Sequence, residues 1–143
     1  MSVDKNLILE FARRHSVCVM STSFDNKPES ALVDFAITDG LEIVFNTYKS
    51  SRKYKNLMRN PNVSVVIGFG DLLQTLQYEG IARELEGHYE GKYINIFKES
   101  KGFFRRWKIK EMIYFKVDPS WVRLSDFSQY PPKTMELNLE KSF

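Results

Sequence analysis

Three short strand patterns follow one another between residues 17 and 46, and this succession limits the folds available to the chain. Residues 17–23 form a strand pattern that begins with the apolar run 17–20, and residues 24–28 carry the turn-forming Asp, Asn and Pro. Residues 29–37 alternate in polarity, and the turn Thr-Asp-Gly at 38–40 leads into a third strand at 41–46. The two faces of the middle strand would carry Ala31, Val33, Phe35 and Ile37, and Ser30, Leu32, Asp34 and Ala36. The pattern predicts a meander of three antiparallel strands.

The other elements are predicted from hydrophobic periodicity and turn residues. Helices are expected at residues 3–15, about 50–60 and 88–108, and strands at 62–69, 72–85, 111–117 and 121–125. Gly80 would mark a bulge or a close backbone approach, residues 118–120 a turn. Sequential strands with three helices favour a mainly β fold, a small closed or half-closed barrel with helices outside. We assign residues 1–128 to one domain and 129–143 to an extended or partly loose C-terminal tail.

Composition excludes several classes of protein. At 143 residues the chain can bury a sizeable core, and 43% hydrophobic with 27% charged residues is ordinary for a globular protein. A net charge of +3 is too low for a nucleic-acid surface, and no segment has the ~20 apolar residues of a membrane helix. The single cysteine, Cys18, lies in an apolar run and is interpreted as a buried thiol. We expect a soluble cytoplasmic protein.

Residues 45–61 combine a strand end, a polar turn and a short basic helix. Four basic side chains gather where this helix begins, beside the hydroxyls of Ser50 and Ser51: Lys49, Arg52, Lys53 and Lys55. A capping hydroxyl with Arg and Lys in the first turn indicates a phosphate-binding site. The alternative is a solvated basic helix with a serine cap.

The sequence holds no self-sufficient catalytic motif. Two histidines, each near a predicted helix end, and one cysteine give no set of metal ligands at suitable spacing. Neither Gly-x-Ser-x-Gly nor His-Glu-x-x-His occurs, and Asp34 is the one carboxylate expected to point into a site. The catalytic residues are therefore unknown, and no metal is expected. If the protein is an enzyme, an anionic cofactor would supply the chemistry.

Several motifs occur in order along the chain: Phe45-Asn46-Thr47, Ser51-Arg52-Lys53, Asn60-Pro61, a Val-rich strand at 63–67, and the stretch from Thr75 to Arg83. In this order they resemble the FMN-binding split-barrel family related to pyridoxamine 5′-phosphate oxidase, over residues 5–123. The resemblance implies a split β-barrel of about six or seven mostly antiparallel strands with flanking helices. It also implies a homodimer with FMN at the interface.

The same resemblance implies which residues would hold the cofactor. The FMN phosphate would be bound by the second motif and the preceding threonine, through Thr47, Ser51, Arg52 and Lys53, and Asn46 would also contact the cofactor. The isoalloxazine ring would lie along Leu32, Val33 and Asp34, with the side chain of Thr75 nearby.

The chain departs from the oxidase itself at three places. Ala31 and Ala36 stand where the oxidase has basic residues, and no histidine follows His88 to hold a vitamin B6 substrate. Oxidation of vitamin B6 is therefore not expected. The leading hypothesis is an FMN-dependent oxidoreductase acting on an unidentified small substrate.

Two other functions stay open. A non-catalytic split barrel could hold haem, a deazaflavin or another ligand, with His15 or His88 as the axial ligand of haem and residues 103–107 as a contact. A nucleic-acid or membrane surface could use the basic stretch 101–110, against which the low net charge argues.

Overall fold

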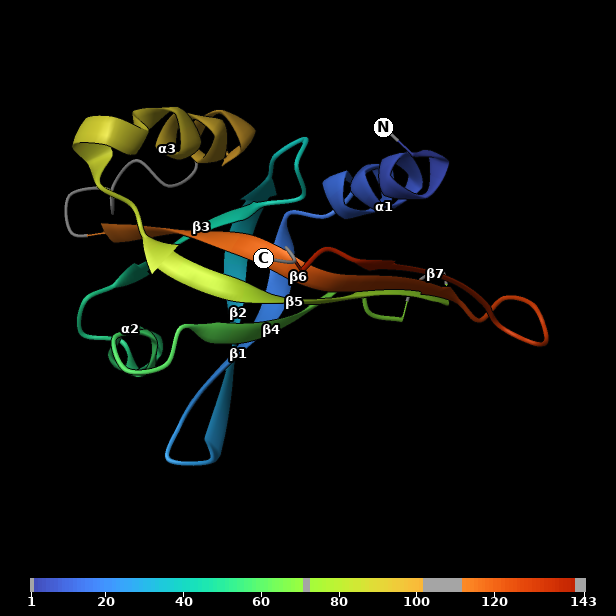
Figure 1. The fold of residues 1–143 in the computed structure, drawn as a ribbon, viewed down its shortest axis with the longest axis horizontal. Helices are drawn as coiled ribbons and strands as arrows, with labels where there is room; N and C mark the ends of the chain where they lie inside the picture. The colour runs from blue at the N-terminus through green and yellow to red at the C-terminus, as the bar shows by residue number, and fades with distance from the viewer. Residues whose placement is uncertain (1, 71–72, 102–111, 141–143) are drawn as a thin grey trace.

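The structure, a computed structural model, describes residues 2–70, 73–101 and 112–140. Three helices and seven strands lie in this part of the chain (Figure 1). In chain order they are α1 (Val3–Arg13), β1 (Val17–Phe24), β2 (Lys27–Ile37), β3 (Ile43–Tyr48), α2 (Arg52–Leu57), β4 (Asn62–Ile67), β5 (Gln74–Glu84), α3 (Gly87–Lys101), β6 (Met112–Asp126) and β7 (Lys133–Asn138).

The strands form one antiparallel sheet in the order β3-β2-β1-β4-β5-β6-β7, and a second pairing of β3 with β6 closes the first six into a barrel. β7 is an additional strand on the outer edge of β6. The predicted mainly β barrel with helices outside is confirmed. Figure 1 shows α1 and α3 on one side of the barrel, and α2 with the β1–β2 hairpin on the other.

The meander forms because its turns have the required chemistry. Asp25 and Asn26 both adopt positive φ, 53° and 60°, as a two-residue hairpin turn between antiparallel strands demands. The register then pairs β1 with β2 along their whole shared length, from Val17 opposite Asp34 to Phe24 opposite Lys27. The predicted alternation is confirmed at Val33, Phe35 and Ile37, which are buried on one face, whereas Ala31 of that face is exposed and Ala36 of the other face is buried in a second cluster.

The main core fills the barrel and extends under α1, whose apolar side contributes Ile8, Phe11 and Ala12. Gly68 lets this helix approach, because a Cβ there would lie 2.7 Å from the Phe11 ring. A second, smaller core lies between α3 and the outer face of the β2–β3–β6 region. Its members are Ala36, Val44, Leu85, Phe97 and Tyr114.

One prediction for the C-terminal part needs correction, and the structure adds detail to another. The predicted turn at 118–120 is wrong: β6 runs unbroken through it, and the irregularity lies on β5, where the register shifts between Glu79 and Gly80. Gly80 permits this because a Cβ there would collide with the Asp118 carbonyl. The stretch predicted as extended or partly loose contains β7, which pairs with β6 from Lys133 to Asn138.

No helix in the described ranges combines the length and the apolar composition that crossing a membrane would require.

Candidate functional site

The barrel opens where β2 and β3 part. Residues 43–45 of β3 pair with residues 35–37 of β2. Residues 46–48 of β3 pair with β6 alone. Residues 27–34 of β2 therefore pair with β1 along one edge, and their other edge pairs with no strand among the described residues. We call this opening the split. Leu32, in the middle of a strand, is 64% exposed here.

The free edge of β2 presents backbone polar groups. A two-residue turn makes Phe24 and Lys27 a hydrogen-bonded pair, and such pairs alternate along antiparallel strands. The N–H and C=O groups of Ser30 and Leu32 consequently point away from β1, toward the split. A planar ligand with amide-like edges could form hydrogen bonds to them as a neighbouring strand would.

A small pocket of about 150 Å³ lies at the split, between β1, β2 and the start of α2. It is lined by Met20, Thr22, Glu29, Ser30, Ala31, Ser51, Arg52 and Lys53. Since its walls combine two cations, hydroxyl groups and one carboxylate, the pocket is suited to a small anionic group.

Ser51 fixes the start of α2. Its Oγ accepts a hydrogen bond from the Tyr54 N–H at 3.0 Å and lies 2.9 Å from the Oγ1 of the buried Thr47. Ser51 is thus the N-cap that the sequence predicted. The helix has only six residues, so we assign the positive charge of the site to the side chains of Arg52 and Lys53 rather than to a helix dipole.

Arg52 and Asn56, one turn apart on α2, hold the same carboxylate. The Arg52 guanidinium lies 2.7 Å from Oε2 of Glu29, and the Asn56 side-chain amide donates to Oε1 of Glu29 at 3.0 Å. The same amide donates to Thr22 Oγ1 at 3.0 Å. These contacts connect α2 to β1 and β2 and place Glu29 within the pocket.

Lys53 is half-buried, and burial lowers its pKa from the usual 10.5. Among the described residues no carboxylate forms an ion pair with its ammonium group. A bound anion would compensate this buried charge. Cys18 is fully buried, which confirms the predicted core thiol, and burial raises the pKa of this thiol to about 12.

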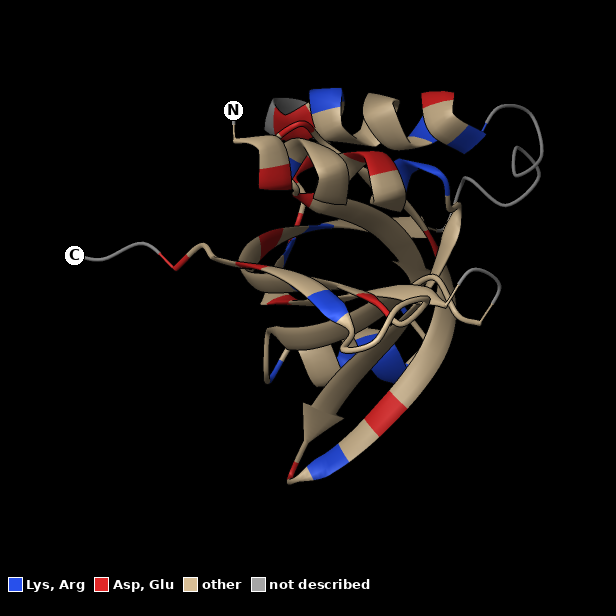
Figure 2. Ribbon diagram, turned by 90° about the vertical axis from the view of Figure 1, so that its right-hand side faces the viewer, with Lys and Arg blue, Asp and Glu red and all other residues tan. Residues whose placement is uncertain are grey.

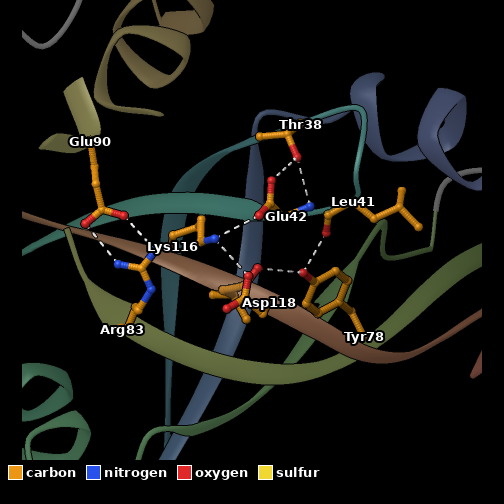
Figure 3. A network of polar contacts seen from close by, with 9 residues as sticks. Thr38, Leu41, Glu42, Tyr78, Arg83, Glu90, Lys116 and Asp118 are labelled. Atoms are coloured by element: carbon orange, nitrogen blue, oxygen red, sulfur yellow. Dashed lines mark hydrogen bonds and ion pairs between the residues drawn. The ribbon is translucent and has the colours of Figure 1, made fainter. Parts of the chain in front are cut away.

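A second polar cluster lies elsewhere on the barrel, around Lys116 (Figure 3). The Lys116 ammonium contacts Glu42 at 2.9 Å and Asp118 at 3.0 Å. Burial acts to lower the pKa of Lys116, but these two partners outweigh it and the pKa is raised. A groove of about 880 Å³ includes Glu42 and Asp118 in its walls. Because both carboxylates are already bound to Lys116, we interpret the cluster as structural.

The family model described as pyridoxamine 5′-phosphate oxidase matches residues 5–125. The chain belongs to this family. General stress protein 26 of Bacillus subtilis (strain 168) is 25% identical over 142 residues, which cover 93% of this chain and 96% of the relative.

Two solved structures of similar fold differ in what their descriptions say they bind. A haem-binding protein from Mycobacterium smegmatis matches with a TM-score of 0.79 at 14% identity, over 96% of this chain and 59% of that protein. An FMN-binding protein related to pyridoxamine 5′-phosphate oxidase, from Nostoc punctiforme PCC 73102, matches with a TM-score of 0.63 at 12% identity, over 95% and 94%. At these identities both show a shared fold.

In this member of the pyridoxamine 5′-phosphate oxidase family, the predicted site residues fall into three places. Thr47, Ser51, Arg52 and Lys53 come together around the start of α2. Leu32, Val33 and Asp34 continue along β2 from the pocket, and Asn46 precedes Thr47 on β3, opposite Tyr114. Thr75 lies on β5 and pairs with Ser125 of β6. Because β1 and β4 separate β5 from β2, the single chain does not bring Thr75 to the pocket.

Sequence reasoning missed Glu29 and Asn56. The alternation of β2 that placed Ala31 and Val33 on one face places Glu29 there too, and Asn56 lies four residues after Arg52 on the same helix face. Both signals were present in the sequence, but their meeting depends on how α2 packs against β1.

Proposed function

We propose that the chain is an FMN-binding flavoprotein that acts as an oxidoreductase on a small substrate. The observation that carries the proposal is the half-buried ammonium of Lys53, beside Arg52 in a pocket at the barrel split. A phosphate monoester has the size and charge to pair with both cations. The hydroxyls of Ser51 and Thr47 fix the loop that presents them.

The free edge of β2 supports a flat, polar-edged ring next to the phosphate. The backbone groups of Ser30 and Leu32, on either side of Ala31 in the pocket wall, face the split. The uracil-like edge of a flavin carries the alternating donors and acceptors that such backbone groups can bind. When bound, FMN would supply hydride transfer; the residues of this chain would bind and orient it.

We also propose a homodimer that would enclose the ring. Leu32, Val19 and Val66 lie side by side across β2, β1 and β4, and form an apolar row on the outer face of the barrel. Leu32 is 64% exposed and the two valines are partly exposed. A second copy would bury this row and complete the ring's surroundings. Sedimentation of wild type and of Val66→Lys tests this, since a monomeric wild type would contradict it.

Other functions have less support. Charges of both signs are interspersed along the described helices and strands (Figure 2), and the basic stretch 101–110 lies almost entirely outside the described residues. For haem, His15 lies between α1 and β1 with its Nδ1 3.1 Å from the Phe11 carbonyl oxygen, and it does not line the pocket. Residues 103–107 and the side chain of His88 lie outside what the structure describes. The single buried cysteine suits the cytoplasmic location that we propose.

A visible absorption spectrum of the purified protein with added FMN, before and after NADPH, tests the proposal. We expect flavin bands perturbed by binding and bleached on reduction. Arg52→Ala with Lys53→Ala should abolish binding. The matched control is Lys49→Ala with Lys55→Ala, which removes two exposed cations of the same segment outside the pocket. No affinity for FMN would refute the proposal, and a Soret band on adding haem would favour the alternative.

A further inference from the structure

The pocket contains its own anion. The carboxylate of Glu29 is bound by Arg52 at 2.7 Å and by Asn56 at 3.0 Å, and the Glu29 side chain is only 16% exposed. We propose that Glu29 is an internal counter-anion that a phosphate monoester must displace from Arg52, so that FMN binds as an exchangeable ligand. This inference rests on the proposed function and adds a residue that sets the affinity of the pocket for FMN.

The charges of the lining residues show why displacement is required. Arg52 and Lys53 contribute two positive charges and Glu29 one negative charge, and the other lining side chains are neutral. The net charge of one is less than the −1.5 to −2 of a phosphate monoester near pH 7. Ala31 adds no charge on the same strand face. Full neutralisation of the phosphate therefore needs the guanidinium that Glu29 already holds.

Displacement is feasible because the two partners differ in exposure. The Arg52 side chain is 72% exposed, and ion pairs that involve so exposed a partner are weak, so it can turn from Glu29 toward a phosphate. Glu29 stays in place through Asn56, which also binds Thr22. Its carboxylate then remains beside the bound phosphate as a like charge, and lowers the affinity.

Binding of FMN and of riboflavin, which lacks the phosphate, tests the proposal in wild type, Glu29→Gln and the control Glu79→Gln. Glu79 is another strand carboxylate that does not line the pocket. We expect Glu29→Gln to lower the Kd of FMN about three- to tenfold and to leave that of riboflavin unchanged. Glu79→Gln should match wild type for both ligands.

A double-mutant cycle gives a second readout. Arg52→Ala should weaken FMN binding more in the Glu29→Gln background than in wild type, because only there is Arg52 fully available. Weaker FMN binding by Glu29→Gln, or an equal change for both ligands, would overturn the proposal and make Glu29 a structural partner of α2. Glu29→Ala serves if the glutamine variant does not fold. If no variant prefers FMN over riboflavin, the proposed function itself fails.

Discussion

Replacing Tyr78 by phenylalanine removes one buried hydroxyl from the core of the barrel. Tyr78 is 1% exposed, and its hydroxyl donates to the Leu41 carbonyl at 2.7 Å, with the Val117 carbonyl at 3.2 Å (Figure 3). Leu41 has a φ of 66° in the turn between β2 and β3. The hydroxyl therefore fixes a strained turn to β5 and β6 across the core.

The size of the effect follows from this geometry. The variant keeps the ring and its packing, so no large cavity forms. It loses one net hydrogen bond and leaves buried carbonyls without their donor, which costs about 1–3 kcal/mol of unfolding free energy. For a chain of this length that corresponds to a fall in Tm of about 2–4 °C per kcal/mol.

The pH dependence makes the prediction specific to the hydroxyl. Burial raises the pKa of Tyr78 well above its usual value of 10.0. Because the folded pKa is the higher one, the stabilisation is fully present below pH 10.0 and is lost above it, by about 1.4 kcal/mol per pH unit. The phenylalanine side chain of the variant has no proton to lose. The difference in unfolding free energy between wild type and variant should therefore become smaller above pH 10.0.

Urea unfolding at about pH 8 and about pH 11, followed by circular dichroism, measures both effects. The matched control is Tyr130→Phe, since Tyr130 is 96% exposed and its change should stay within about 0.5 kcal/mol. The reasoning would be refuted if the unfolding free energies of wild type and Tyr78→Phe differed by less than about 0.5 kcal/mol at the lower pH. It would also be refuted if this difference were the same at the higher pH.

Three other features give further tests. The buried thiol of Cys18 should not react with a disulfide reagent in the native protein but should react once per chain in denaturant; a reactive native thiol would contradict its burial. Gly80→Ala should lower the unfolding free energy by about 1–3 kcal/mol in urea, whereas Gly91→Ala, with open space around its Cβ, should not. FMN affinity by calorimetry should fall as the pH rises through the lowered pKa of Lys53 toward 10.5, because the amine loses its charge, and Lys53→Ala should lose this dependence.

Local chemistry accounts for what the sequence predicted. Asp25 and Asn26 suit a turn with positive φ, Ser51 suits an N-cap, and the polarity of residues 29–37 alternates, so the meander and the start of α2 were predictable. The bulge at Gly80 was predictable as a position, because glycine within a strand pattern indicates one.

Long-range contacts account for what it did not. Asp118 and Pro119 look like a turn in the sequence, but pairing with the bulged strand keeps β6 continuous across them. β7 pairs with β6, and its Met135 and Leu137 pack against the main core. The segment is mostly polar and follows two prolines, so its sequence does not predict this contact. The position of Glu29 between Arg52 and Asn56 likewise depends on two elements far apart in the sequence.

The split bears on how the protein avoids aggregation through its open strand edge. Open strand edges recruit strands from other molecules, and closure of β3 on β6 removes that hazard from most of the barrel. Where β2 remains open, Pro28 has no N–H to offer, and the charged Lys27 and Glu29 flank it. Residues 30–34 make up the rest of this open edge, about the length of an ordinary strand of roughly five residues, and they end at the charged Asp34. The opening can thus admit a ligand, while the proline and the charged residues along this edge disfavour pairing with a strand of another molecule.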